Sequence, residues 1–457
     1  MRIVMVGSGY VGLVSGACLA DFGHQVVCID KDRAKLRALR QGDIPIYEPG
    51  LADLVRNNLK EKRLSFANEL AEHVAAADAT FIAVGTPRRD DGHADLSYVY
   101  NVAREVAAAV KGFSVLITKS TVPVGTCDEI QRIIHLERPD ADVAVISNPE
   151  FLREGAAIRD FKFPDRVVVG CDDERAKKVL ADMYRPLSLS KVPILYTTRR
   201  NAELIKYAAN AFLATKITFI NEIADLCEKV GGDIQEVARG IGLDNRIGTK
   251  FLHAGPGFGG SCFPKDVRAL IKTGQDHGVS LRILEAVEMV NDNRKRAMSR
   301  KISAVVAGGL RDRTVAVLGL SFKPNTDDLR EAPSISLVTA LEDMGANVRA
   351  FDPAAMDQAK LVLPKLTYCE SAYHCAEGAD ALVIVTEWEQ FRALDLARLR
   401  NVMASPVIVD LRNIYEPEGV RQHGFAYVCV GRVDKGSLNS ETSSEVATLS
   451  HRKSQRR

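Results

Sequence analysis

Residues 2–12 read Arg-Ile-Val-Met-Val-Gly-Ser-Gly-Tyr-Val-Gly, an apolar run that passes directly into a glycine-rich turn. The β-branched run predicts a buried strand, and the G-x-G-x-x-G spacing after it is typical of a strand–turn–helix unit that binds a dinucleotide. Gly7 would form the turn, Gly9 would let a pyrophosphate approach the backbone, and Gly12 would allow close helix–strand packing. The alternative is a tight turn without a ligand.

An acidic residue at the end of the next predicted strand supports the dinucleotide interpretation. Asp30 follows Gly12 by 18 residues, close to the spacing at which a carboxylate meets the adenosine ribose hydroxyls. It would repel a 2′-phosphate, which favours NAD over NADP, although Lys31 and Arg33 partly offset that repulsion.

Short β-branched runs alternate with amphipathic stretches along most of the chain, the pattern of parallel sheets covered by helices. In the N-terminal part the expected strands are residues 2–6, 25–30, 80–84, 114–118, 143–147 and 166–169, with the first helices at 11–22 and 31–40. A second block has expected strands at 313–319, 347–351, 381–385 and 406–410. The sequence therefore predicts an α/β protein with two doubly wound, Rossmann-like domains.

Residues 200–230 contain neither glycine nor proline, which predicts one long central helix that joins these domains. The helical pattern continues at 233–240 and 265–305. A helix of this length would be exposed on several sides unless a second copy covered it, so we expect dimerisation through it. The expected domains are residues 1–198 (dinucleotide binding), 199–305 (central helical dimerisation domain), 306–436 (C-terminal α/β domain) and 437–457 (disordered tail).

The composition excludes several classes of partner. The 61 basic and 59 acidic residues nearly cancel, which gives no reason to expect binding to nucleic acid or to an anionic membrane. No apolar run is as long as the roughly 18–20 residues that cross a bilayer. The nine cysteines are scattered without a C-x-x-C pair or a metal-like cluster, so we expect no metal site. Their odd number and the lack of a signal peptide indicate reduced thiols and a cytoplasmic location.

One cysteine has an unusual setting. Residues 257–266 read Gly-Phe-Gly-Gly-Ser-Cys-Phe-Pro-Lys-Asp, and Pro264 favours the first turn of a helix. Cys262 would then lie at the positive end of that helix, where a thiol loses its proton more easily. An isolated cysteine is more often a small buried residue, but the glycines and the nearby Asp266 favour a nucleophile. A poised thiolate together with a hydride carrier predicts oxidation of an alcohol to an acid through a thioester.

Other polar residues are candidates for the same chemistry. Lys206 and Asn210, four residues apart on the long helix, could stabilise an oxyanion, although two solvated side chains are the commoner outcome for such a pair. Glu150 and Glu154 follow a predicted strand and could activate water, or could instead complement a helix N-terminus. Thr121 also follows a predicted strand, where the alternative is a simple turn hydroxyl.

Together these motifs resemble those of the UDP-glucose/GDP-mannose dehydrogenase family, over about residues 1–430. The most specific segments are residues 7–12, 120–125, 148–155, 201–210, 245–266 and 323–330. The resemblance implies NAD-dependent, two-step oxidation of the C6 alcohol of UDP-glucose to UDP-glucuronate, with two NADH formed. It also implies an N-terminal NAD domain, a dimer-forming helical centre and a C-terminal domain that binds the UDP-sugar.

The resemblance further implies a role for each catalytic candidate. Cys262 would hold the sugar as a thiohemiacetal and then as a thioester. Lys206 and Asn210 would stabilise the oxyanion, while Thr121 and Asp266 would organise water and protons. Glu154, alone or with Glu150, would assist hydrolysis of the thioester, and the choice of the hydrolytic base between these two glutamates stays open.

Binding residues follow from the same resemblance. The implied NAD contacts are Gly7, Gly9, Tyr10, Val11, Gly12, Asp30, Lys35, Thr86, Thr121, Glu154, Lys265 and Arg330. The implied substrate contacts are Glu150, Phe151, Leu152, Glu154, Lys206, Asn210, Arg246, Phe251, Leu252, His253, Ala254, Gly255, Gly259 and Lys323. Arg246 would reach the substrate of a neighbouring subunit, and His253 stands where some relatives carry lysine.

Three other functions remain open at this point. The first is a related enzyme that oxidises GDP-mannose or a UDP-N-acetylhexosamine, because the C6 chemistry would be the same. The second is an NAD-sensing or scaffold protein, which would have little physical reason to keep Cys262, Lys206, Asn210 and Asp266 together. The third is an alcohol dehydrogenase that stops at the aldehyde or ketone, a reaction that needs no thiol.

Overall fold

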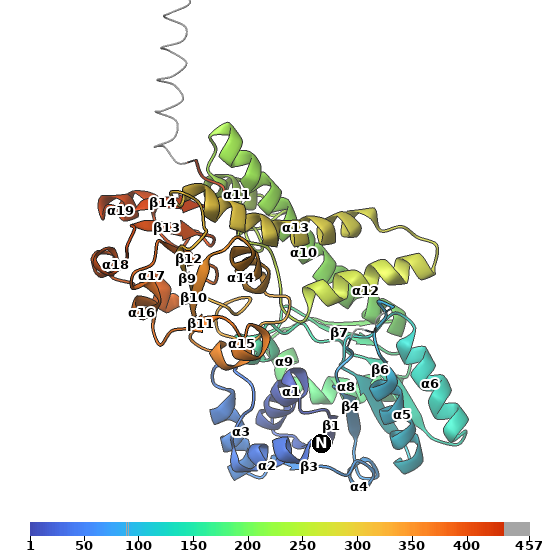
Figure 1. Ribbon diagram of the computed structural model, residues 1–457. Helices are drawn as coiled ribbons and strands as arrows, with labels where there is room; N and C mark the ends of the chain where they lie inside the picture. The colour runs from blue at the N-terminus through green and yellow to red at the C-terminus, as the bar shows by residue number, and fades with distance from the viewer. Residues whose placement is uncertain (88, 90, 434–457) are drawn as a thin grey trace, which may run out of the picture. The chain divides into compact units, whose positions relative to one another are not determined.

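The computed structural model describes residues 1–87, 89 and 91–433 (Figure 1). The tail expected at 437–457 lies outside the described residues. Backbone contacts divide the chain into two compact units. Unit 1 comprises Met1–Ala211 and Lys265–Arg282, and unit 2 comprises Phe212–Pro264 and the chain from Ile283 onward. The domain boundaries expected from the sequence stay a prediction.

Unit 1 is built on one twisted sheet with strand order β3-β2-β1-β4-β5-β6-β7-β8. Its strands are β1 (Arg2–Val6), β2 (Gln25–Ile29), β3 (Leu64–Ala67), β4 (Ala79–Ile82), β5 (Ser114–Thr118), β6 (Val143–Ser147), β7 (Val167–Gly170) and β8 (Ile194–Thr197). Neighbouring strands are parallel except β6 and β7, which pair antiparallel at Ser147 and Gly170. The order 3-2-1-4-5-6 at its start is that of the dinucleotide-binding fold.

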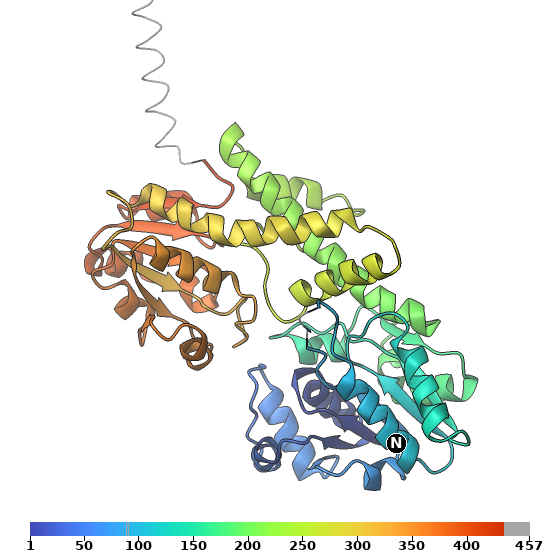
Figure 2. The ribbon, with the colours of Figure 1, turned by 45° about the vertical axis from the view of Figure 1, so that its right-hand side comes forward.

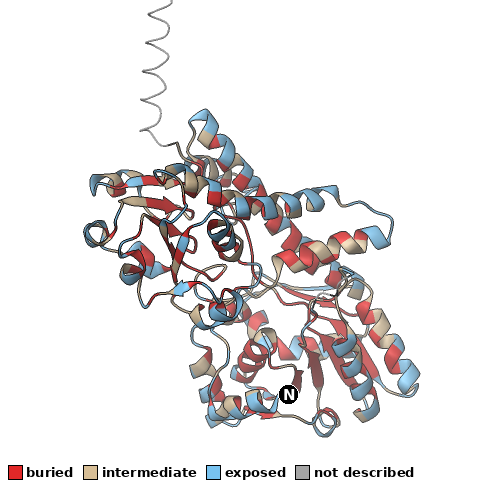
Figure 3. Cartoon of the chain, viewed as in Figure 1, coloured by how far each residue is buried: buried red, intermediate tan, exposed pale blue. Residues whose placement is uncertain are grey.

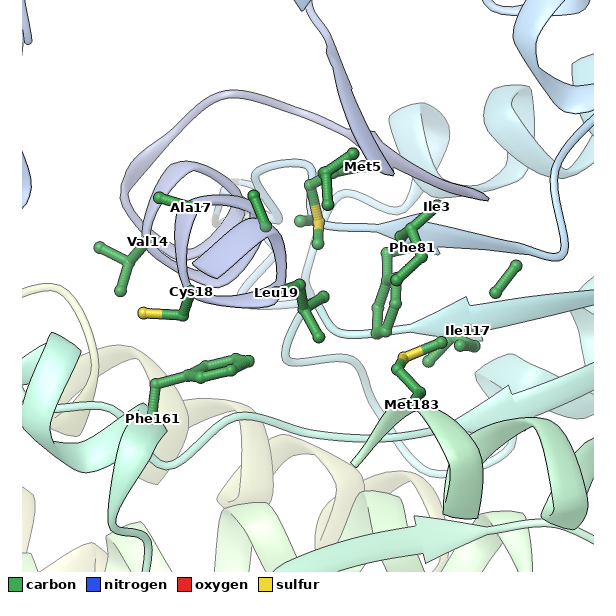
Figure 4. Close-up of a cluster of buried hydrophobic side chains, with 14 of the residues drawn as sticks. Ile3, Met5, Val14, Ala17, Cys18, Leu19, Phe81, Ile117, Phe161 and Met183 are labelled. Carbon is green, nitrogen blue, oxygen red and sulfur yellow. The ribbon is translucent and has the colours of Figure 1, made fainter. Parts of the chain in front are cut away.

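The helices of unit 1 bury the apolar faces of this sheet. They are α1 (Tyr10–Asp21), α2 (Arg33–Gln41), α3 (Leu51–Lys60), α4 (Ala71–Val74), α5 (Ser97–Ala109), α6 (Thr126–Glu137), α7 (Ala157–Lys162), α8 (Glu174–Met183) and α9 (Arg185–Leu189). In Figure 4, Met5 of β1 and Phe81 of β4 lie with Leu19 of α1 and Met183 of α8, all fully buried. This core fixes α1 against the strand from which the glycine turn leaves.

Unit 2 contains a second sheet with strand order β11-β10-β9-β12-β13-β14. Its strands are β9 (Thr314–Leu318), β10 (Asn347–Phe351), β11 (Thr367–Tyr368), β12 (Ala381–Ile384), β13 (Val407–Asp410) and β14 (Ala426–Cys429). All neighbours pair in parallel, and the order matches that of the first six strands of unit 1 when the strands are counted from β9. The inner strands of both sheets are largely buried (Figure 3). The prediction of two doubly wound domains is therefore confirmed.

The remaining helices follow β8 along the chain or alternate with the strands of the second sheet. They are α10 (Arg199–Val230), α11 (Ile234–Gly242), α12 (Phe263–Asp276), α13 (Arg282–Val305), α14 (Pro333–Asp343), α15 (Met356–Val362), α16 (Ala372–Ala376), α17 (Glu389–Arg392), α18 (Leu396–Val402) and α19 (Pro417–Gln422). Figure 2 shows α10 as one unbroken helix, as expected from its sequence. Within the described residues, no helix combines the length and the hydropathy that a membrane crossing requires.

The structure corrects two expected helices. The pattern at 265–305 forms two helices, because Gly278 adopts a left-handed φ of +71° that ends α12. The helix expected at 31–40 begins at Arg33, because the Asp32 carboxylate accepts hydrogen bonds from the amides of Ala34 and Lys35 and caps it.

The sequence also missed four strands, β3, β8, β11 and β14. All four lie at the edges of their sheets. They are short and partly exposed, with only two residues in β11. An edge strand needs only one buried face, so it lacks the continuous apolar run by which the inner strands were recognised.

Candidate active site

The turn between β1 and α1 has the backbone shape that the glycine motif predicts. Gly7 has a φ of +102°, and a Cβ on it would lie 2.5 Å from the carbonyl oxygen of Ala83. A Cβ on Gly12 would lie 1.9 Å from the carbonyl oxygen of Gly7. Around Gly9, by contrast, no atom of the described residues beyond its chain neighbours lies within 4 Å of the Cβ position. The turn therefore excludes side chains where it packs and is open where a ligand would approach.

The N-terminus of α1 suits an anion. Gly9 precedes this helix, and the described part of the chain supplies neither a capping side chain nor an acidic residue in its first turn. The next helix differs, because Asp32 caps it. An uncapped positive helix end beside an open glycine backbone fits the pyrophosphate of a dinucleotide.

Asp30, which follows β2, is oriented beside this turn. Its carboxylate accepts hydrogen bonds from the amides of Ser8 and Asp32, each at 3.0 Å, and pairs with the Lys35 ammonium at 2.9 Å. Burial alone would raise the pKa of Asp30, but these hydrogen bonds hold it below its ordinary value. Asp30 is therefore an ionised acceptor at the end of β2, the position that binds a ribose in this fold.

The carboxyl ends of β4 and β5 bring two more predicted residues together. The Thr86 hydroxyl donates to the carbonyl oxygen of Thr121 at 3.0 Å. The Ser120 hydroxyl donates to the carbonyl oxygen of Val84 at 2.7 Å, which fixes the same two loops to each other. Ligands of doubly wound sheets bind at these strand ends.

Four predicted catalytic residues form two buried pairs in unit 1. The Lys206 ammonium lies 2.9 Å from the Glu150 carboxylate, and both side chains are about 95% buried. The Asn210 amide donates to the Asp266 carboxylate at 2.7 Å, and Lys265 approaches the other oxygen of Asp266 at 2.7 Å. Lys206 and Asn210 are thus buried, whereas their four-residue spacing taken alone favours two solvated side chains. Each holds a buried carboxylate, which would be costly to leave unpaired.

Cys262 belongs to unit 2 and directly precedes α12. Pro264 occupies the second position of α12 and Asp266 lies in its first turn, as the sequence predicts. The thiol is half-buried, and its sulfur lies 3.4 Å from the Ser261 hydroxyl. A cysteine that directly precedes a helix lies at the positive end of the helix dipole, and this position favours the thiolate form.

The loop that leads to Cys262 is held by buried polar side chains that the sequence did not reveal. The Asn221 amide oxygen accepts from Gly255 N at 2.8 Å, and Arg294 donates to the Gly255 carbonyl at 2.6 Å. Asn291 both accepts from and donates to the backbone of Phe258, at 2.8 and 3.1 Å. One feature of the sequence could have indicated these side chains, namely polar residues on the apolar faces of α10 and α13. Polar residues that become buried are expected to have hydrogen-bond partners.

The end of this loop packs closely against a second predicted segment. Gly260 N donates to the carbonyl oxygen of Arg330 at 2.7 Å, and a Cβ on Gly259 would lie 2.4 Å from the carbonyl oxygen of Glu331. The Arg330 side chain is exposed and pairs with Asp328 at 2.8 Å. The structure thus brings together Gly259, a predicted substrate contact, and Arg330, a predicted NAD contact.

The remaining predicted residues lie in loops or at helix starts. Val11 is in the first turn of α1, Lys323 is half-buried in unit 2, and the loops carry Phe151, Leu152, Glu154, Arg246, Phe251, Leu252, His253 and Ala254. Leu252 and Ala254 belong to the apolar core of unit 2. His253 is exposed, and Arg246 is 89% exposed beside Asp244.

A buried lysine that the sequence did not single out follows β5 in unit 1. The Lys119 ammonium donates to the Asn148 amide oxygen at 3.2 Å and lies 3.5 Å from the Tyr184 hydroxyl. Burial lowers the pKa of Lys119 from 10.5 to about 8, while Glu150 raises it and Lys206 lowers it. Burial therefore disfavours the charged form of Lys119 more than the nearby Glu150 favours it.

Comparison with known proteins identifies related sequences along nearly the whole chain. Three models of the UDP-glucose/GDP-mannose dehydrogenase family match, the NAD binding domain at residues 1–188, the central domain at 200–293 and the UDP binding domain at 316–417. A UDP-glucose 6-dehydrogenase of Rhizobium meliloti is 61% identical over 437 residues, covering 95% of this chain and 100% of that protein.

Solved structures are similar in fold. A UDP-glucose dehydrogenase from Pyrobaculum islandicum has a TM-score of 0.85 and 42% identity, with 93% of this chain and 96% of that chain covered. A UDP-D-ManNAc dehydrogenase from Pyrococcus horikoshii has a TM-score of 0.82 but only 26% identity, with 94% and 99% covered.

We predict that Lys119→Met changes how stability depends on pH. The pKa of Lys119 is lower in the folded chain, about 8, than its ordinary 10.5, so the folded state binds the proton less well. Burial of the protonated lysine therefore lowers the free energy of unfolding. This loss of stability is fully present below about pH 8 and disappears as pH rises towards about 10.5. Between about pH 7 and about pH 9.5 the free energy of unfolding of the wild type should increase by on the order of 2 kcal/mol relative to that of the variant.

Urea unfolding followed by circular dichroism at both pH values measures this difference. Lys178→Met, which removes an exposed lysine of α8, is the matched control and should leave the pH dependence unchanged. A stability difference between wild type and Lys119→Met that is the same at both pH values would contradict the prediction.

Proposed function

The chain belongs to the UDP-glucose/GDP-mannose dehydrogenase family, and from that membership we propose that it oxidises the C6 alcohol of UDP-glucose to the carboxylate, giving UDP-glucuronate. The identity of 61% to a UDP-glucose 6-dehydrogenase over 95% of the chain supports this substrate. The observation that carries the chemistry is the buried Asn210–Asp266 hydrogen bond, which holds the first turn of the helix that follows Cys262.

NAD is the cofactor, and residues of unit 1 fit it. The open backbone at Gly9 and the start of α1 would receive the pyrophosphate, and Asp30 would accept from the adenosine ribose. When bound, NAD supplies the acceptor for the hydride that each of the two oxidations removes. The other NAD contacts implied by the family, Tyr10, Val11, Lys35, Thr86, Thr121, Glu154, Lys265 and Arg330, are part of this proposal.

In the proposed reaction Cys262 keeps the half-oxidised sugar on the protein. Its thiolate forms a C–S bond to the aldehyde carbon, and the carbonyl oxygen takes up a proton to give a thiohemiacetal. Loss of a hydride and a proton from that carbon and its hydroxyl leaves a thioester. Lys206 and Asn210 would stabilise negative charge on the reacting oxygen at each stage.

Hydrolysis completes the reaction. Water adds to the thioester carbon and gives up a proton, the C–S bond breaks, and the thiolate of Cys262 is restored. We assign the general base to Glu154, because Glu150 is committed to the buried ion pair with Lys206 and would orient that ammonium. Thr121 and Asp266 would organise the water and the protons.

The choice among nucleotide sugars is also a proposal. The structurally similar UDP-D-ManNAc dehydrogenase shares only 26% identity, against 61% and 42% for the UDP-glucose enzymes. The substrate contacts that the family implies are Phe151, Leu152, Arg246, Phe251, Leu252, His253, Ala254, Gly255, Gly259 and Lys323 together with the catalytic residues. GDP-mannose or a UDP-N-acetylhexosamine is the alternative. The cytoplasmic location remains part of the proposal.

We propose that two copies associate through α10. Large apolar side chains recur every seven residues along it, with exposures of 66% at Phe212, 50% at Phe219 and 53% at Leu226. A seven-residue apolar repeat is the pattern of a seam between packed helices. The exposed Arg246 would then reach the substrate of the second copy.

Replacing the thiol tests the proposed chemistry. Cys262→Ser should lower UDP-glucuronate formation by on the order of 10³-fold or more, because a hydroxyl is a far poorer nucleophile than a thiolate. NAD affinity measured by calorimetry should be unchanged. The matched control is Cys171→Ser, a buried cysteine after β7, which should keep its activity. Wild-type rates of acid formation by Cys262→Ser would defeat the assignment.

A charge introduced into the seven-residue apolar repeat of α10 tests whether two copies associate through this helix. Phe219→Asp should shift the mass in solution, measured by light scattering, from dimer to monomer, because a buried unpaired carboxylate is costly in an interface. Leu136→Asp, at an apolar residue of α6 that is 64% exposed, is the control and should remain dimeric. A dimeric Phe219→Asp variant would show that another surface mediates association.

A further inference from the structure

Two cysteines at one edge of the second sheet have no part in the proposed reaction (Figure 1). Cys369 directly follows the edge strand β11, and Cys375 lies in α16. Both thiols are free, with exposures of 2% and 0%, and both belong to the same apolar cluster of unit 2. Neighbouring thiols can share a proton or join as a disulfide, so the groups around this pair decide its chemistry.

The register of the strands places Cys369 on the same face of the sheet as a cation. Arg349 of β10 is opposite Thr367 of β11, and side chains alternate between the two faces of a sheet. Cys369, two residues after Thr367, is therefore on the face that carries Arg349. The α16 helix covers this face, because the Arg349 guanidinium donates to the carbonyl oxygens of His374 and Glu377 at 2.6 and 2.7 Å.

Arg349 keeps one donor for an anion on this face. Its Nε is buried and makes no hydrogen bond to any residue that the structure describes, whereas its other two nitrogens hold the end of α16. A buried N–H without an acceptor is unfavourable, and hydrogen bonds to a charged acceptor are the stronger ones. The guanidinium is therefore suited to stabilise a thiolate at Cys369.

The two thiols differ in acidity. A hydrogen bond from the Cys375 thiol, together with the charges of Arg349 and His374, lowers the pKa of Cys369 below its ordinary value in spite of burial. The same hydrogen bond, together with burial, raises the pKa of Cys375. Cys369 is thus the thiolate of the pair, and Cys375 carries the proton.

We propose that Cys369 and Cys375 form a reversible redox site, separate from Cys262, at which a small hydroperoxide converts the dithiol into an internal disulfide. The Cys369 thiolate attacks a peroxide oxygen, so that an S–O bond forms, the O–O bond breaks, and the departing hydroxide or alkoxide takes up a proton. Cys375 then gives up its proton and attacks the sulfenic acid, so that an S–S bond forms and water leaves. The dithiol loses two electrons, and the peroxide gains them.

The position of the pair in the fold lets a small oxidant reach it. The edge strand β11 has two residues and α16 has five, and Glu370 and His374 beside the cysteines are exposed. Short elements at a sheet edge open locally at a far lower free energy than the whole domain unfolds. Exposure of Cys369 therefore requires opening of this edge rather than of unit 2.

Peptide mapping of the full-length protein tests the proposal. The protein is treated with hydrogen peroxide, alkylated at intervals with N-ethylmaleimide in denaturant, and digested with trypsin. Cys369 and Cys375 share the tryptic peptide 366–392. We expect this peptide to lose two hydrogens and both alkylation sites, and dithiothreitol to restore them. Further cleavage after Glu370 should leave the two halves joined only in the oxidised form.

A second pair of buried cysteines is the matched control in the same sample. Cys18 of α1 and Cys28 of β2 are both 0% exposed and share the tryptic peptide 3–31. Burial raises the pKa of each to about 12, and neither is expected to form a thiolate. Peptide 366–392 should therefore be oxidised about tenfold faster than peptide 3–31, or more.

Two variants test the roles within the pair. Cys375→Ser removes the second thiol, so a sulfenic acid should accumulate on Cys369, where dimedone traps it. Cys369→Ser removes the thiolate, so Cys375 should stay reduced. A dimedone adduct on Cys375 in Cys369→Ser would overturn the assignment of Cys369 as the attacking thiolate.

The wild type decides the proposal whether or not these variants fold. Oxidation of peptide 366–392 no faster than that of peptide 3–31, or formation of a sulfinic acid on Cys369 without a disulfide, would overturn it. The measurement needs neither NAD nor UDP-glucose, so its outcome is independent of the proposed function.

Discussion

A buried hydrogen bond between Asn210 and Asp266 fixes the first turn of α12 to α10, and the proposed chemistry depends on it. Both residues are at least 90% buried, so breaking this bond would leave one oxygen of a buried carboxylate without its hydrogen-bond donor. The turn it holds begins one residue after Cys262. The Glu150–Lys206 pair fixes the loop after β6 to the same helix. Buried polar pairs on α10, rather than exposed contacts, thus hold the residues of unit 1 to which the proposal gives catalytic roles.

The second sheet repeats the order of the first six strands of the sheet in unit 1, but the two differ at the equivalent acidic residue. Asp30 follows β2 and is only half-buried, whereas Asp352 follows β10 and is 1% exposed. The Asp352 carboxylate accepts from Leu320 N at 2.7 Å and Ser321 N at 3.0 Å, and from the indole of Trp388 at 3.2 Å. Because these hydrogen bonds already occupy the Asp352 carboxylate, it has less capacity to accept hydrogen bonds from ribose hydroxyls. The same fold therefore presents different chemistry at the two sheets.

Local pattern in the sequence predicted the fold where structure depends on near neighbours. The inner strands, the glycine turn at Gly7 and the unbroken α10 are recognisable because each signal lies within one element. The residues that the sequence missed act over long separations. Glu48 bonds to an amide 107 residues away, and Asn291 bonds to a loop 33 residues before it. No periodicity carries such information, because the partners meet only in the folded chain. The roles assigned to the site residues remain predictions.

In the proposed reaction one sulfur holds the sugar between two oxidations. The direct measurement is the number of NADH molecules formed per sugar consumed, with excess NAD and limiting UDP-glucose, and with GDP-mannose and a UDP-N-acetylhexosamine in parallel. We expect two NADH per UDP-glucose and far slower turnover of the other sugars. One NADH per sugar with release of an aldehyde, or a clear preference for another nucleotide sugar, would contradict it.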